Sequence, residues 1–125
     1  PQEHTTRAIV DLGELQRATR TASIFAKDGS GIIRIQMAPG ANGGGTVTIS
    51  SRAEELGDNT GEIEASVEGE EGKIAFNSRY LSDVLAVLGK DKVAMEMTTS
   101  SSPGVIKPVD SDNYIHVVMP MFVQW

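Results

Sequence analysis

Short stretches of the chain alternate hydrophobic and polar residues with a period of two, which is the pattern of half-buried β-strands. Apolar side chains hold every second position in four of these stretches, residues 33–37, 46–50, 62–67 and 93–97. Further extended runs cover residues 6–10, 73–76, 105–107 and 114–119. The sequence therefore predicts eight short strands.

Two other stretches have helical spacing. Between residues 12 and 22 apolar residues recur every three or four positions, which predicts a helix that ends near Ala22 or Ser23. Asp11 precedes this helix as an N-cap, and Glu14 completes a pattern that resembles a capping box. Ile24 and Phe25 are expected to follow the helix directly, before a turn.

The second helix is expected after residue 76, with Asn77 or Ser78 as its N-cap and Gly89 at its C-terminal cap. Its apolar stripe is predicted to consist of Tyr80, Leu81, Val84, Leu85 and Leu88.

The order of the predicted elements repeats. A strand, a helix and three strands are followed by the same series, and the proposed caps Asp11 and Asn77 are 66 residues apart. This indicates an internal duplication of a βαβββ unit. We expect an α+β fold in which a body of antiparallel sheet carries two helices on one face.

Composition sets the class of protein. The 125 residues are enough for one domain, and 39% hydrophobic with 22% charged residues is typical of a globular protein. No apolar run approaches the length that crosses a bilayer, so neither membrane contact nor a secretory signal is expected. The absence of cysteine excludes disulfides and thiolate chemistry and favours a cytoplasmic location.

The acidity of the chain is concentrated in one segment. The net charge of -6 argues at first against a nucleic-acid partner. However, eight acids lie between Ser51 and Gly72, opposed only by Arg52, and the rest of the chain holds nine acids and ten bases. The segment is either the solvated face of a hairpin or a docking surface for a basic partner.

Residue patterns typical of catalysis are missing from the sequence. His4 and His116 are isolated, and no pair of His, Cys or carboxylate residues has metal-ligand spacing. No nucleophile motif occurs, and the Gly43–Gly45 run lacks the lysine of a phosphate-binding loop. We therefore expect a binding or assembly module with no metal and no cofactor, and not an enzyme.

Two features suggest binding. Arg17 and Arg20 share a helix face, where they are either solvated or a weak basic surface for phosphates. Residues 117–121 are a continuous apolar run, which fits either a buried strand or a groove that exploits flexible methionine side chains. Proline at 120 should release Met121 and Phe122 from the sheet.

The chain resembles the third, C-terminal domain of the bacterial DNA polymerase III beta sliding clamps. Three segments carry the resemblance and, with the strands between them, cover essentially the whole chain: residues 20–34, residues 76–85, and residues 102–108 with Tyr114 and 117–121. The helix motif Tyr-x-x-Asp-Val-Leu followed by a Val-Val-Met-Pro-Met terminus is the specific part. The alternative is a small α+β ligand-binding domain or enzyme that shares the pattern by chance.

The resemblance implies the DNA-clamp fold, with residues 1–125 as a single domain of a three-domain chain. Two such chains would form a homodimeric ring around double-stranded DNA, without base specificity and without catalysis. The ring would be a replication processivity factor that tethers the replicative polymerase. Its implied partners are the DNA polymerase III alpha subunit, the clamp loader, and other replication and repair proteins.

The resemblance also implies roles for particular residues. The third-domain wall of the family's peptide-binding pocket would consist of Asn77, Tyr80, Pro103, Val117, Val118, Met119, Pro120 and Met121. Ile24 and Phe25 would lie in the dimer interface. The acidic segment, especially residues 62–67, would lie near the edge strand that pairs with the first domain of the partner subunit. Arg17 and Arg20 would face the DNA. Residues 122–125 depart from the family pattern, and this aromatic tail could lie beside the pocket or fill it.

Overall fold

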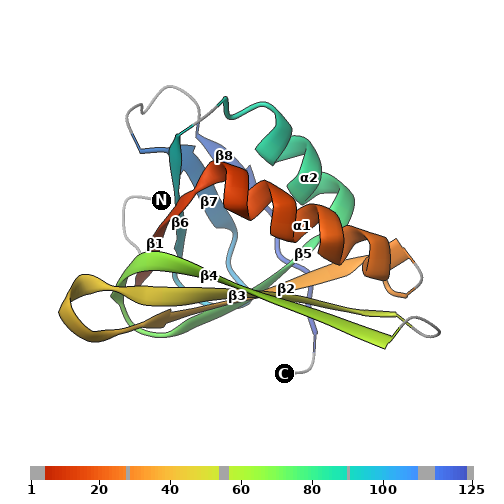
Figure 1. Cartoon of the computed structure of the whole chain (residues 1–125), viewed down its shortest axis with the longest axis horizontal. Coiled ribbons are helices and arrows are strands. Elements are labelled where there is room, and N and C mark those ends of the chain that lie inside the picture. The colour runs from red at the N-terminus through yellow and green to blue at the C-terminus, as the bar shows by residue number, and fades with distance from the viewer. Residues whose placement is uncertain (1–4, 28, 54–56, 90, 110–114, 124–125) are drawn as a thin grey trace.

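The computed structural model describes residues 5–27, 29–53, 57–89, 91–109 and 115–123. It contains the predicted series of elements twice (Figure 1). The elements are β1 (Thr6–Asp11), α1 (Leu12–Lys27), β2 (Ile32–Pro39), β3 (Gly45–Ala53), β4 (Gly57–Gly69), β5 (Gly72–Asn77), α2 (Ser78–Ala86), β6 (Lys92–Met97), β7 (Gly104–Pro108) and β8 (His116–Val118), with one short 3-10 turn, η1 (Ala41–Gly43), between β2 and β3.

The strands form one antiparallel sheet in the order β5-β2-β3-β4-β1-β6-β7-β8. The two helices pack side by side and cover one side of the curved sheet (Figure 1). The α+β class and the duplicated βαβββ architecture are thus confirmed.

The first strand of each repeat pairs with the other repeat. β1 pairs with β6 along its whole length, and β5 pairs with β2 in the same way. A further backbone bond, from the Met121 N–H to the Ala75 carbonyl at 2.7 Å, joins the segment after β8 to β5. Because each repeat supplies a strand to the other's half of the sheet, the two repeats form one folding unit with a shared core.

The period-two pattern correctly predicts the core positions of the strands. Ile33, Ile35 and Met37 of β2 are buried, as are Val93 and Met95 of β6. β2 therefore directs one face of its side chains into the core, whereas in β6 the intervening Ala94 is buried as well. Fully burying an isoleucine, valine or methionine side chain stabilises the fold by about 1.5–3 kcal/mol.

Both helices begin at the predicted side-chain caps. The Oδ2 atom of Asp11 accepts a hydrogen bond from the Glu14 N–H at 3.0 Å. The Oδ1 atom of Asn77 accepts two, from the Arg79 N–H at 2.9 Å and the Tyr80 N–H at 3.2 Å, so Asn77 is the cap of α2 and Ser78 is its first residue. The two caps occupy equivalent positions in the two repeats, which supports the duplication.

The predicted end of α1 is wrong. The helix continues past Ala22 and Ser23 to Lys27, because Ala26 repeats the four-residue spacing of buried positions and is itself buried. The N–H groups of Gly29 and Gly31 then bond to the Ala26 carbonyl at 3.0 and 2.9 Å, and Gly31 has a φ of 76°, a left-handed conformation suited to glycine. Residues 24 and 25 therefore lie in the helix, not after it.

Two details of α2 also differ from the prediction. Its helical residues end at Ala86, so Gly89, with a φ of 87°, lies beyond the last turn. Tyr80 does not belong to the buried stripe, since 64% of its surface is exposed, whereas Leu81, Leu85 and Leu88 are buried.

Candidate binding surfaces

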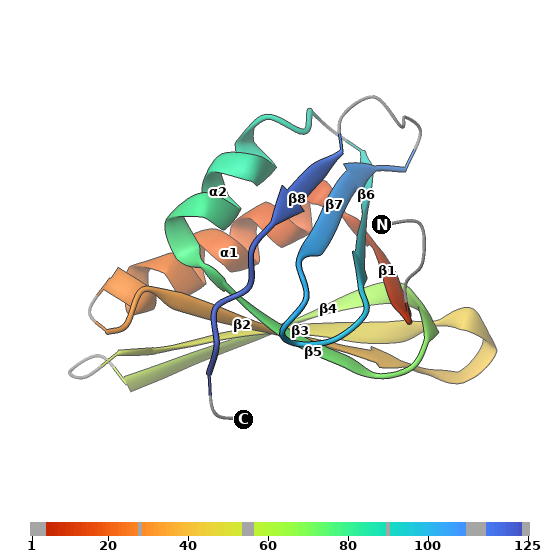
Figure 2. The ribbon, with the colours of Figure 1, turned by 180° about the vertical axis from the view of Figure 1, so that it is seen from behind.

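The residues predicted for a pocket lie together where the start of α2 meets β8. α2 contacts β8, and the segment after β8 runs past the end of β5 from which α2 begins (Figure 2). Gly104 pairs with Val118, so Pro103 lies beside the residues that follow β8. All eight predicted positions thus come from one region, which we call the α2–β8 surface: Asn77, Tyr80, Pro103, Val117, Val118, Met119, Pro120 and Met121.

The apolar run within the α2–β8 surface is buried on one side only. Val118 and Pro120 are buried, whereas Val117, Met119 and Met121 are 56%, 68% and 37% exposed. The run is therefore not a strand buried on both faces. Alternate side chains anchor it to the core and leave large apolar groups in solvent, which is the composition of a docking surface.

The polar groups of this surface hold its backbone in place. Asn77 uses its side chain to cap α2, which fixes the first turn that carries the exposed Tyr80 ring. The Met121 N–H bonds to β5, which fixes the segment that carries Met119. The Phe122 side chain is 78% exposed and does not fill the surface. Residues 124 and 125 lie outside the described part of the chain.

A second surface lies along β4. This strand pairs with β3 through residues 57–65 but with β1 only through residues 66–69. In the described part of the chain, the second backbone edge of residues 57–65 has no strand partner. β4 is an inner strand of the sheet order, but it has an open edge over most of its length.

The open edge of β4 borders an acidic recess. Lys92 is its only basic residue in the described structure. The residues that line the recess are Ile9, Asp11, Glu14, Glu62, Ile63, Glu64, Ala65, Ser66 and Lys92. An unpaired edge with this charge suits a strand that carries basic side chains.

Ile24 and Phe25 lie on the same side of the molecule as the open edge. The Ser51 hydroxyl donates to the Ala22 carbonyl at 2.7 Å, and Ser51 pairs with Asn59 at the start of that edge. The last turns of α1 therefore pass over β3 beside the start of the open edge. Ile24 is 58% exposed and Phe25 is half-buried, so the helix adds apolar surface beside the free backbone groups.

The acidic segment is exposed and belongs to β4 and the turn after it. Six of its eight acids lie in the described residues, and all six are exposed: Asp58, Glu62, Glu64, Glu68, Glu70 and Glu71. Glu68 lies 3.7 Å from Arg7, which also binds Glu96 at 2.9 Å. Lys107 lies 3.7 Å from Glu96, and this ion-pair ladder crosses β4, β1, β6 and β7.

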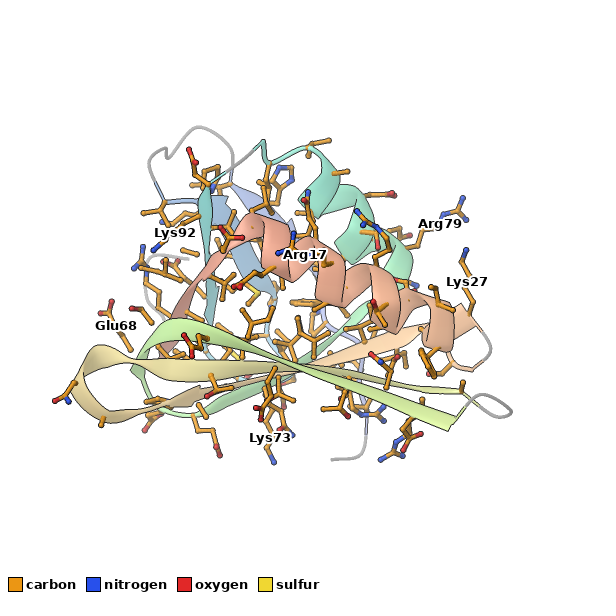
Figure 3. The ribbon with its side chains drawn as sticks, in the orientation of Figure 1. Arg17, Lys27, Glu68, Lys73, Arg79 and Lys92 are labelled. Atoms are coloured by element: carbon orange, nitrogen blue, oxygen red, sulfur yellow. The ribbon has the colours of Figure 1, made fainter. Side chains whose placement is uncertain are left out.

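The layer formed by α1 and α2, here called the helix layer, carries positively charged side chains, opposite in sign to the acidic segment. Arg17, Lys27 and Arg79 project from α1 and α2, whereas Lys73 projects from the other side of the sheet (Figure 3). Arg17 and Arg20 are both exposed, and the ion pairs between described residues include neither of them. The two predicted DNA-facing arginines are thus available to an external anion.

Three further observations concern the described residues. Within them no three His, Cys, Asp or Glu side chains form a group that could hold a metal ion. His116 is half-buried in β8, and His4 lies outside the described ranges. None of the helices seen is long and apolar enough to cross a membrane.

The architecture defined above, two interlocked βαβββ repeats with paired helices, is that of a DNA-clamp domain. Residues 1–122 match the family of the DNA polymerase III beta subunit, C-terminal domain, and the chain belongs to this family.

Relatives and solved structures agree with this assignment. The chain is 30% identical over 123 residues to the beta sliding clamp of Staphylococcus aureus, covering 97% of this chain and 31% of the relative. The DNA polymerase III beta subunit of Thermotoga maritima superposes with a TM-score of 0.90 at 27% identity, over 99% of this chain and 32% of that one. The Bacillus subtilis sliding clamp superposes with a TM-score of 0.88 at 27% identity, over 99% of this chain and 32% of that one. The chain thus spans about a third of the length of these proteins.

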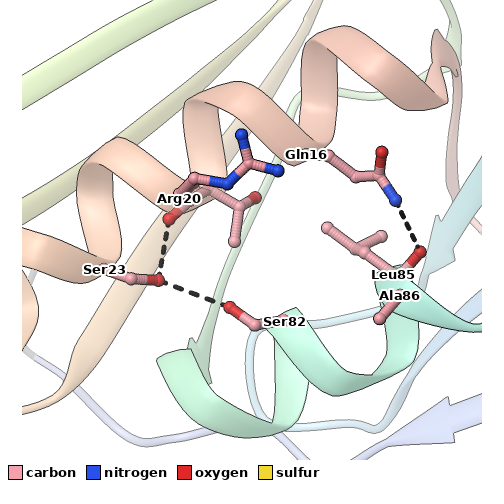
Figure 4. Close-up of a pocket in the computed structure, with 7 residues that line it drawn as sticks. Gln16, Arg20, Ser23, Ser82, Leu85 and Ala86 are labelled. Atoms are coloured by element: carbon pink, nitrogen blue, oxygen red, sulfur yellow. Dashed lines mark hydrogen bonds between the residues drawn. The ribbon is translucent and has the colours of Figure 1, made fainter.

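Two features of the structure are not among the predicted sites. The open edge of β4 depends on where the β1 ladder stops, which residue spacing does not reveal. A groove between α1 and α2 is lined by polar residues at positions 16, 19, 20 and 23 of α1 (Figure 4), and this spacing of three and four was visible in the sequence.

Proposed function

We propose that this chain is the third domain of a three-domain sliding clamp subunit, a non-catalytic processivity factor of DNA replication in the cytoplasm. Two subunits would close into a ring around duplex DNA and tether the replicative polymerase. The family match over residues 1–122 carries this proposal. The exposed apolar side chains of the α2–β8 surface support its docking role.

The α2–β8 surface would bind extended peptides with leucine and phenylalanine anchors. Tyr80, Val117 and Met119 present exposed apolar area, and flexible methionine adapts to different anchors. Burying a few such side chains on both partners concentrates the binding energy in a small patch. The polymerase alpha subunit, the clamp loader and repair proteins would compete for this patch.

The open edge of β4 would join the partner subunit. A strand from the partner's first domain would satisfy the free backbone groups of residues 57–65, and basic residues on it would face Glu62 and Glu64 in the acidic recess. Ile24 and Phe25 would add the apolar contact beside this pairing.

The enclosed DNA duplex would run past α1 and α2, which would face it. A protein that grips DNA strongly is basic overall, whereas a ring that encloses DNA needs only a modestly positive inner face. Free Arg17 and Arg20 on the helices, with the acids on β4 and its turn, fit the second arrangement despite the net charge of -6.

Peptide titration followed by NMR tests the docking surface. We expect a peptide with a Gln-Leu-x-Leu-Phe core to shift the amide signals of β8 and the first turn of α2. Met119→Ala or Tyr80→Ala should weaken binding about tenfold, because each removes an exposed anchor contact. Val87→Ala is the matched control, since Val87 is 64% exposed on the other end of α2. Shifts located away from the α2–β8 surface, or an equal loss in the control, would contradict the assignment.

A further inference from the structure

The five methionines of the chain fall into two groups by exposure. Met37, Met95 and Met97 belong to the shared core and are 1%, 3% and 4% exposed. Met119 and Met121 are 68% and 37% exposed. Both exposed methionines belong to the α2–β8 surface, so the thioether groups that solvent reaches are confined to one surface of the molecule.

These thioethers are the sulfur groups that a mild oxidant meets. The sequence contains no cysteine, so no thiol competes for the oxidant. With hydrogen peroxide, the sulfur lone pair forms an S–O bond to one peroxide oxygen, the O–O bond breaks, and the second oxygen leaves as water with both protons. The sulfur is oxidised by two electrons to a sulfoxide, and the peroxide is reduced.

The fold protects the three core methionines from this reaction. They line one small space together with Ile74 and Phe76. Its volume of about 10 Å³ is at the lower limit for a single water molecule, so hydrogen peroxide, which is larger, has no room beside them. Oxidation of a core methionine therefore requires the core to open, whereas the exposed pair reacts in the folded state.

Oxidation of the exposed pair leaves the framework of the α2–β8 surface in place. The Met121 N–H bonds to the Ala75 carbonyl at 2.7 Å, and the buried Val118 anchors the run through its pairing with Gly104. Neither contact uses a thioether. The chemical change is therefore confined to the polarity of two side chains on the surface.

That change opposes docking of an apolar anchor. A thioether is apolar and flexible and packs against leucine or phenylalanine, whereas a sulfoxide is polar. A leucine or phenylalanine side chain offers no donor to the sulfoxide oxygen, which would lose its hydration without a replacement when the anchor covers it. Tyr80 and Val117 stay apolar, so docking is weakened and not abolished.

We propose that Met119 is a reversible oxidation site that controls peptide docking, with the less exposed Met121 as a slower second site. The inference rests on the proposed function of the α2–β8 surface and adds regulation to it. A peroxide would release the docked partners. A methionine sulfoxide reductase would restore docking, since it returns the sulfoxide to the thioether while the oxygen leaves as water and a dithiol is oxidised to a disulfide.

The test combines residue-resolved mass spectrometry with peptide affinity. Hydrogen peroxide should add oxygen to Met119 first and to Met121 next in the folded chain, and to the core methionines only in urea. The treated chain should bind the Gln-Leu-x-Leu-Phe peptide about tenfold more weakly, with an unchanged thermal midpoint. Incubation with the reductase and a dithiol should restore the affinity.

Two substitutions assign the effect to one sulfur. The readout for each variant is the ratio of its own affinities before and after peroxide. Met119→Leu should lower this ratio from about tenfold to about twofold or less, because leucine has a similar volume and no sulfur. Met95→Leu is the matched control in the core and should keep the full ratio.

The outcomes separate this site from the docking role. An untreated chain that does not bind the peptide would overturn the docking surface and the inference with it. Normal binding before treatment and equal binding after complete oxidation of Met119 would overturn the inference alone. A full response to peroxide in Met119→Leu would do the same, as would a lowered thermal midpoint with oxygen on the core methionines, because the loss would then come from damage to the core.

Discussion

The two βαβββ repeats have the same order of elements and equivalent helix caps, yet they offer different kinds of surface. In the first repeat α1 has 16 residues and β4 has 13, whereas in the second α2 has 9 and β8 has 3. The long β4 extends beyond its partner β1 and exposes backbone groups. The short β8 ends early and exposes side chains of the segment that follows.

This difference shows how a duplicated fold can acquire two binding modes. A free strand edge binds another strand through regular backbone hydrogen bonds, and the side chains beside it add affinity and specificity. A patch of exposed tyrosine, valine and methionine binds through the shape and polarity of its side chains. In the proposed function, subunit contact falls to the first repeat and peptide docking to the second.

The largest expected effect concerns the surface of the first repeat. In the complete protein, Ile24→Ala combined with Phe25→Ala should raise the dimer dissociation constant at least tenfold, because it removes the apolar contact beside the open edge. Sedimentation velocity measures the shift toward monomer.

The peptide affinity of this double variant should stay unchanged, since the substituted residues lie in the first repeat and the α2–β8 surface lies in the second. A dimer as stable as the wild type would place the interface elsewhere. A parallel loss of peptide binding would mean that the two surfaces are not separate.

Comparison of the two N-caps sharpens the distinction. Replacing an N-cap residue by alanine lowers the free energy of unfolding by about 0.5–2 kcal/mol. The loss for Asn77→Ala should be larger than the loss for Asp11→Ala, because Asn77 accepts two backbone hydrogen bonds and Asp11 accepts one. Urea unfolding of the chain gives both values.

The same pair of variants reports on docking. Asn77→Ala should weaken binding of the Gln-Leu-x-Leu-Phe peptide, since it loosens the turn that carries Tyr80, while Asp11→Ala should leave the affinity as it is. The reverse order of stabilities, or an equal effect on peptide binding, would show that the caps do not support different functions.

The smallest effect is expected from the C-terminal tail. Deleting residues 122–125 should change peptide affinity by less than about twofold, because the Phe122 side chain points into solvent and is 78% exposed. Fluorescence anisotropy of a labelled peptide measures this difference. A clear gain in affinity on deletion would show that the tail covers the α2–β8 surface in solution.

Local patterns were sufficient for most of the fold. Alternation identified the buried residues of β2 and β6, and the short polar residues Asp11 and Asn77 marked the helix starts because their side chains satisfy free N–H groups of the first turn. The end of α1 was misjudged because Ile24 and Phe25 interrupt the apolar spacing on the solvent side, while Ala26 continues it on the buried side.

The candidate sites required more than local patterns. Family resemblance brought Asn77, Tyr80 and the 117–121 run together, and their proximity depends on the meeting of α2 with β8. The open edge of β4 depends on two strand registers at once, and the exposure of Met119 and Met121 depends on how the segment after β8 packs against β5. Neither property is encoded in the spacing of a single segment.

Retention of the complete protein on DNA of defined topology tests the proposed clamp most directly. After loading by its clamp loader, the protein should stay on a closed circular plasmid through gel filtration and should leave rapidly when the plasmid is cut once, since a ring can slide off a free end. Equal retention on circular and linear DNA would contradict the account, because it would show that contact, and not encirclement, holds the protein on the duplex.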